Sequence, residues 1–183
     1  MIEALLILAA GPAMSAMDAE RAFAADAQKV GQWTSFRKWA TADAIMFLPQ
    51  AGSAQAFLKG KADPPEAVFW WPGRSFVSCD GTAAVNTGPW VRQGGKSVGY
   101  FTTVWLRQPD GGWKWTLDHG DTLPKPRPEG GDIKADQAAC PNVTLPPTPK
   151  REFAKDVKYG DGSSKDGTLR WNWAVLPDGS RTF

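Results

Sequence analysis

Three tight-turn signals constrain this chain more than any other feature of its sequence. Each contains glycine, which supplies the positive φ that a short hairpin turn requires: Asp80-Gly81, Gly94-Gly95 and Asp110-Gly111-Gly112. The segments beside these turns have strand character, at Ala67–Ser78, Thr82–Arg92, Ser97–Arg107 and Trp113–His119. Because short turns force successive strands to run antiparallel, the sequence predicts a four-stranded meander. Pro89 lacks an N–H donor, so its strand is expected to be bulged or at a sheet edge there.

Before the meander, the sequence predicts two helices and one strand. Asp18–Val30 contains strong helix formers, with Ser15 and Asp18 as candidate caps and Gly31 as a stop. The next segment, Gln32–Ala40, places Trp33, Phe36 and Trp39 on one helical face. Asp43–Pro49 then has the pattern of a strand that ends at proline. Helices followed by an antiparallel sheet indicate an α+β fold.

The C-terminal third has a different character. Leu123–Lys150 is rich in proline and small polar residues and lacks periodicity, which is typical of an extended connector. Thr168–Leu176 is a further strand candidate, followed by a turn at Pro177-Asp178-Gly179, and so an extra hairpin is expected. The chain of 183 residues therefore divides into a signal-like segment (1–16), one domain (17–123) and a Pro-rich connector with a C-terminal strand extension (124–183).

The N-terminus and the two cysteines bear on the compartment. Leu5–Ala10 is a short apolar run followed by small residues, which resembles a secretory signal with Ala13 and Ser15 at the −3 and −1 positions. This pattern predicts a periplasmic or secreted protein, and the alternative is a frayed N-terminus on a cytoplasmic one. Cys79 and Cys140 fit export if they pair; unpaired, they are two small buried hydrophobes.

Composition excludes several classes of function. The formal net charge is +2, and Lys and Arg form no dense block, so a dedicated nucleic-acid binder is not expected. One histidine and two cysteines are too few for multi-histidine or four-cysteine metal sites. The sequence contains no phosphate loop, nucleotide fingerprint or nucleophile elbow. It also lacks an apolar run long enough for an integral membrane segment. We therefore expect no metal and no cofactor.

Three segments carry a resemblance to a known superfamily: AERAFAADAQKVG, ATADAIMFLP and GYFTTVWLRQPDGGWKWTLDHGD. Over about Asp18–Leu123 they resemble the nuclear transport factor 2-like superfamily, closest to its small bacterial domains related to the polyketide cyclase (SnoaL-like) group. The resemblance implies a cone-shaped, curved antiparallel sheet covered by the N-terminal helices, an apolar cavity, and a homodimer through the outer sheet face. The superfamily includes dehydratases, isomerases, epoxide hydrolases, cyclases and binding modules, so the fold alone does not choose a function.

Two residues are candidates for acid–base chemistry. Strict alternation along the last meander strand puts His119 on the apolar face with Trp113 and Trp115, pointing into the cone, and Asp118 on the other face. His119 is thus a candidate proton-transfer group, and the alternative is a strand-end histidine that bonds a loop carbonyl. The resemblance places Asp43 near the cavity mouth; the alternative is a carboxylate that holds backbone donors at the strand start.

Aromatic residues are the candidate ligand contacts. Those expected around a cavity are Trp33, Trp90, Tyr100, Trp113 and Trp115, although core packing explains most buried tryptophans equally well. Three functions follow. The first is a binding module for a small apolar or aromatic molecule, the second a cofactor-independent dehydratase, isomerase or cyclase using His119 and Asp43, and the third a dimerising structural domain. Binding ranks first because few polar groups accompany the aromatic ones.

Overall fold

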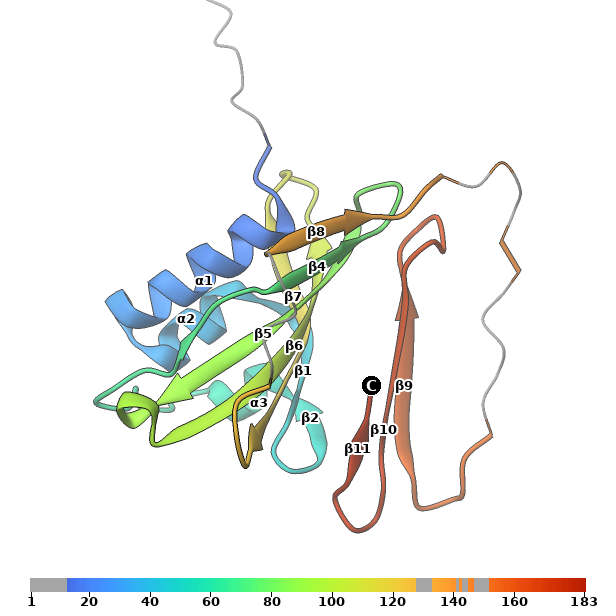
Figure 1. Cartoon of the computed structure of the whole chain (residues 1–183). Helices are drawn as coiled ribbons and strands as arrows, with labels where there is room; N and C mark the ends of the chain where they lie inside the picture. Colours follow the sequence, from blue (N-terminus) through green and yellow to red (C-terminus); the bar gives the residue numbers. More distant parts are fainter. Residues whose placement is uncertain (1–12, 128–132, 141, 143–144, 147–151) are drawn as a thin grey trace, which may run out of the picture.

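Two helices begin the described part of the chain, where the sequence predicts them (Figure 1). The computed structural model describes residues 13–127, 133–140, 142, 145–146 and 152–183. Helix α1 (Ala16–Val30) starts at Ser15, whose side chain accepts a hydrogen bond from the Asp18 N–H, and it ends at Gly31, which has a φ of 102°. Helix α2 (Gln32–Trp39) follows directly. None of the described helices has the length and apolar character needed to cross a membrane.

The main sheet has eight strands, and the predicted meander forms its centre. The strand order is β2-β1-β7-β6-β5-β4-β8, with β3 also pairing with β5. The pairs β4–β5, β5–β6 and β6–β7 are antiparallel, whereas β1–β7 and β4–β8 are parallel, so the sheet is mixed rather than purely antiparallel. The elements are β1 (Ala40–Phe47), β2 (Ala51–Ser53), α3 (Ala54–Leu58), β3 (Phe69–Trp70), β4 (Arg74–Val77), β5 (Ala83–Arg92), η1 (Gln93–Gly95), β6 (Ser97–Arg107), β7 (Trp113–Leu123) and β8 (Lys134–Gln137).

A break divides the first predicted meander strand into β3 and β4. It lies at Pro72-Gly73, opposite Pro89 of β5, and neither proline has an N–H to offer the ladder. Regular pairing on this side of β5 is interrupted at Pro89, although the Trp71 N–H still donates to the Pro89 carbonyl oxygen, so the predicted local edge is a break in the neighbouring strand. Gly88 allows the backbone at Trp71 to approach β5 closely, because a Cβ at position 88 would lie 2.1 Å from the Trp71 carbonyl oxygen.

A β-bulge in β7 changes which side chains face the helices. Trp115 pairs with Trp105, but Leu117 pairs with the adjacent Val104, so Thr116 is an extra residue in β7. The bulge shifts the alternation by one residue. Trp115 packs in the core under the helices, whereas Leu117 belongs to a second cluster on the opposite face. The prediction that His119 shares a face with Trp113 and Trp115 is therefore wrong, and Asp118 takes the inward position.

The C-terminal segment forms a second, three-stranded sheet against the outer face of the main sheet (Figure 1). Its strands are β9 (Lys158–Ser163), β10 (Arg170–Val175) and β11 (Arg181–Thr182). Trp173 and Val175 of β10 pack against Phe47, Val104 and Leu117. The outer face predicted to form a homodimer is thus covered, in this part, by the chain's own C-terminus.

Two similar turns join the second sheet to the first. Ser78–Thr82 and Ser164–Thr168 share the pattern Ser-x-Asp-Gly-Thr. The Asp80 N–H donates to Asp166 Oδ2 at 2.9 Å, and the Asp166 N–H donates to Asp80 Oδ2 at 3.0 Å. Beside these turns, Cys79 forms a disulfide with Cys140, which follows β8. The predicted domain boundary at Leu123 coincides with the end of β7, although β8, beyond that boundary, belongs to the main sheet.

Candidate functional site

A cavity of about 160 Å³ lies between the N-terminal helices and the inner face of the main sheet. Most of its wall is aromatic or aliphatic, and its polar residues include Gln32, Arg92 and Asp118. The aromatic lining residues are Phe23, Trp33, Phe36, Phe47, Trp70, Trp90 and Phe101. Helices α1 and α2 supply three of these, because their apolar faces turn toward the sheet. Apolar walls with a few polar groups are typical of small-molecule sites.

Asp118 is the carboxylate of this cavity. The bulge at Thr116 turns it inward, and the Thr103 hydroxyl of β6 donates to its Oδ1 at 2.8 Å. Burial raises the pKa of Asp118 to about 6, and the hydrogen bond from Thr103 opposes this shift only in part. The sequence analysis placed Asp118 on the face that points away from the cone, because nothing in Trp-Lys-Trp-Thr-Leu signals a bulge.

A second carboxyl, Glu20, lies under the cavity floor and is fully buried. The indole of Trp70 donates to its Oε1 at 2.9 Å, and the indole of Trp105 donates to its Oε2 at 2.6 Å. The amide of Asn86 also donates to Oε2, at 3.3 Å. Burial raises the pKa of Glu20 to about 7, more than the three donors lower it, and the charge of Asp118 adds to the rise. Sequence reasoning missed Glu20, although the α1 period places it with Ala16, Phe23 and Ala27 on the apolar face.

Comparison with known proteins finds distant similarity to solved structures. No family model and no curated protein matches the chain. Among solved structures, a candidate ketosteroid isomerase from Parabacteroides distasonis is 19% identical, with a TM-score of 0.48 over 60% of this chain and 89% of its own. A nuclear transport factor 2-like superfamily protein from Salmonella enterica is 16% identical, with a TM-score of 0.43 over 63% of this chain and 93% of its own. The S. rosetta CaMKII hub is 18% identical, with a TM-score of 0.45 over 63% of this chain and all of its own.

The order of elements is the one that the sequence resemblance implies: two helices, a strand, and a meander that curves around the helices (Figure 1). The architecture is α+β, with a curved mixed sheet packed on the N-terminal helices. At these identities and TM-scores the comparisons say nothing about activity, so the chemistry of this chain has to be derived from its own residues.

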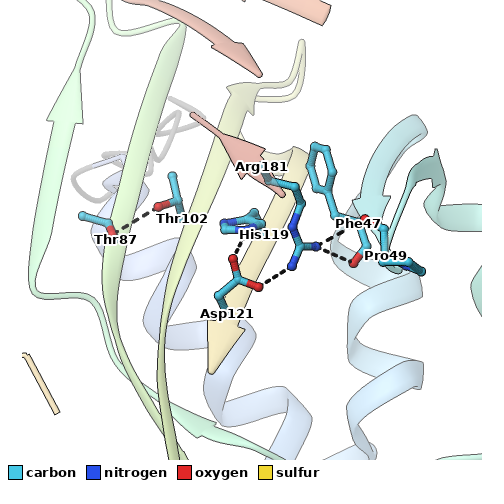
Figure 2. A network of polar contacts seen from close by, with 7 residues as sticks. All are labelled: Phe47, Pro49, Thr87, Thr102, His119, Asp121 and Arg181. Atoms are coloured by element: carbon cyan, nitrogen blue, oxygen red, sulfur yellow. Dashed lines mark hydrogen bonds and ion pairs between the residues drawn. The ribbon is translucent and has the colours of Figure 1, made fainter. Parts of the chain in front are cut away.

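His119 lies in a network that fastens the C-terminus to the outer face (Figure 2). Its Nε2 lies 2.9 Å from Asp121 Oδ2, and its ring centroid is 3.9 Å from that of Phe183. Arg181 pairs with the other oxygen of Asp121 and also donates to the carbonyl oxygens of Phe47 and Pro49. Burial lowers the pKa of His119, assisted by Arg181 and opposed by Asp121. His119 borders the cavity, but its ring is engaged by the C-terminal strand.

The remaining predicted site residues separate into two groups. Trp33 and Trp90 line the cavity, whereas Tyr100, Trp113 and Trp115 do not. Trp113 donates its indole N–H to the Met14 carbonyl oxygen at 2.9 Å, and Trp115 is fully buried in the core. Asp43 is exposed and is not among the lining residues, so it and His119 do not form the predicted catalytic pair around the cavity.

Proposed function

We propose that this protein binds a small, single-ring apolar or aromatic molecule in the cavity between its helices and its sheet. The observation that supports this most is the cavity wall, where aromatic side chains surround one inward carboxylate, Asp118. An apolar cavity of about 150 Å³ is large enough for benzene. The cavity here, of about 160 Å³, suits a ligand of that size rather than a steroid-sized one.

One aromatic residue of the cavity wall supplies a way to test this proposal. Trp33 is half-buried between Phe36 and Phe57 and lines the cavity, so its indole is expected to contact a bound ring. Tyr100 is a matched aromatic residue outside the lining. Titration calorimetry with benzyl alcohol is expected to show binding to wild type, at least tenfold weaker binding to Trp33→Ala, and unchanged binding to Tyr100→Ala. Absence of binding to wild type, or equal effects of the two substitutions, would contradict the proposal.

A second candidate function, proton transfer, attaches to Asp118. A carboxyl whose pKa is about 6, held by Thr103 in an apolar wall, can accept and return a proton near neutral pH. This candidate replaces His119 and Asp43 as the acid–base groups of a cofactor-independent enzyme. It predicts that the protein exchanges an activated C–H of a bound cyclic ketone with deuterium from D₂O, and that Asp118→Asn abolishes the exchange while ligand binding persists. Exchange no faster than in buffer would exclude it.

We also propose export to the periplasm or the extracellular medium. The Cys79–Cys140 disulfide supports this, because disulfides persist in oxidising compartments. Cleavage after Ser15 would remove the cap of α1 and the Met14 carbonyl that Trp113 bonds, so the cut is expected N-terminal to Met14. Intact-mass measurement on protein from the native host tests this, and a full-length cytoplasmic species would contradict it.

A further inference from the structure

Asp118 lacks a cationic partner among the residues that the structure describes. It takes part in none of the ion pairs found there, and the one hydrogen bond it accepts, from Thr103, engages Oδ1. Within the same described ranges, Oδ2 accepts no hydrogen bond from the protein. A carboxylate in an apolar cavity is costly unless its charge is compensated. A ligand that enters this cavity is thus offered an uncompensated anionic oxygen.

The charged groups around Asp118 do not compensate it. Glu20, under the cavity floor, adds a second carboxyl whose charge repels that of Asp118. His119 borders the cavity, but its ring packs on Phe183, and burial favours its neutral form. Arg92 lines the cavity but is exposed, and its guanidinium lies over the Trp90 ring, 5.6 Å from the centroid. The interior of the cavity therefore favours positive charge.

The aromatic walls have the same preference. The faces of indole and phenyl rings carry negative potential and attract cations, more strongly where water is excluded. Phe23 packs edge to face on Trp70, with ring centroids 4.9 Å apart, and Phe36 lies 5.8 Å from the same indole in a similar arrangement. With Trp33, Trp90 and Phe101 they surround the space next to Asp118. Aromatic rings around a lone carboxylate form a site suited to an organic cation.

We propose that the ligand is a small organic cation: a protonated amine on a body about the size of one ring. This inference rests on the proposed function, because it requires that the cavity binds a small molecule. The ammonium N–H donates to Asp118 Oδ2 and lies against the aromatic faces, while the apolar body fills the rest of the cavity. An anion is repelled by both carboxyls. A neutral alcohol can donate one hydrogen bond to Oδ2 but leaves the negative charge uncompensated.

Three ring compounds that differ in one group test the proposal: benzylamine, benzyl alcohol and benzoate, each titrated calorimetrically at pH 7.5. Wild type is expected to bind benzylamine at least tenfold more tightly than benzyl alcohol and to bind benzoate most weakly. Asp118→Asn keeps the acceptor for Thr103 and removes the charge, so the preference for the amine should disappear. Asp156→Asn removes an exposed carboxylate and should preserve it.

The affinities of wild type for the three compounds test the cation preference by themselves, even if the Asp118→Asn variant is too unstable to measure. Equal affinity for benzylamine and benzyl alcohol, or tighter binding of benzoate, would overturn the cation preference while leaving small-molecule binding in place. Failure of all three to bind would remove the proposed function as well. A preference for benzylamine that survives Asp118→Asn would also overturn the assignment, because another group would then have to provide it.

Discussion

Replacing Glu20 with glutamine should alter the pH dependence of folding in a defined direction. Glu20 is fully buried and accepts hydrogen bonds from Trp70, Trp105 and Asn86. Its pKa is about 7 in the folded protein against 4.5 for an unperturbed glutamate. Between these values the unfolded chain has lost the proton while the folded protein still holds it. The free energy of unfolding therefore falls as pH rises from 4.5 through 7.

The magnitude follows from the shift. A difference of 2.5 between about 7 and 4.5, at about 1.36 kcal/mol for each unit, corresponds to roughly 3 kcal/mol lost across that range. Glutamine does not titrate, so Glu20→Gln abolishes this contribution. However, its NH₂ group cannot accept from an indole, and leaving one buried indole N–H unpaired costs about 1–3 kcal/mol at every pH. The variant should be less stable than wild type at pH 4.5 and as stable or more stable at pH 8.

Urea unfolding followed by fluorescence at pH 4.5, 6, 7 and 8, with the disulfide intact, measures this difference. Carboxyls that do not interact with Glu20 titrate in both proteins, so their contributions cancel in the comparison of wild type with variant, and the repulsion between Glu20 and Asp118 is part of the difference measured. Glu66→Gln changes an exposed glutamate and should follow the wild-type pH dependence. If the curves of wild type and Glu20→Gln run parallel from pH 4.5 to 8, Glu20 does not hold a proton in the folded core.

Three further predictions concern the outer face and the disulfide. His119→Ala should lower the free energy of unfolding by about 1–3 kcal/mol and change benzyl alcohol binding little, because His119 borders the cavity but its ring packs on Phe183 and pairs with Asp121. Thermal melting with and without benzyl alcohol checks this, and lost binding at unchanged stability would show that the ring serves the ligand rather than the C-terminal strand. Trp173→Ala should cost about 3–5 kcal/mol in urea unfolding, since Trp173 packs on Phe47 in the outer cluster; a cost below 1 kcal/mol would show that the C-terminal sheet does not rest on the main one. A thiol assay on the denatured, unreduced protein should find no free thiol, and two reactive thiols would contradict the pairing of Cys79 with Cys140. Reduction should lower the free energy of unfolding by about 4 kcal/mol, which is the value that the chain-entropy model gives for a loop of 61 residues.

The meander was predictable because its determinants are local. Glycine at Gly81 and Gly111 adopts positive φ in the structure, and the predicted strand Ser97–Arg107 has the same bounds as β6. Pro89 likewise indicated an interruption of the strand pairing, which lies between β3 and β4. Turn chemistry of this kind acts within a few residues, so no knowledge of the tertiary structure is needed to recognise it.

The site was less predictable because one extra residue in β7, Thr116, changed which of the following side chains face the cavity. The bulge at Thr116 depends on how β7 pairs with β6 and β1, and alternation alone cannot reveal it. It turned Asp118 toward the cavity interior and directed the His119 ring toward Phe183 at the C-terminus. Strand β9 (Lys158–Ser163) also has no strand signal of its own, because three of its residues are Gly or Asp, and it forms by pairing with β10. The small sheet that covers part of the outer face of the main sheet depends on that pairing, so the sequence did not predict it.

Indole N–H signals in a ¹⁵N–¹H NMR spectrum test the proposed binding cavity most directly. The ten tryptophans give separate side-chain probes, which single Trp→Phe variants assign. Titration with benzyl alcohol is predicted to shift the signals of Trp33, Trp70 and Trp90, which line the cavity, and to leave those of Trp113 and Trp171 in place. Shifts confined to Trp171 and Trp173, on the outer side of the sheet, or no shifts at millimolar ligand would contradict binding in the cavity.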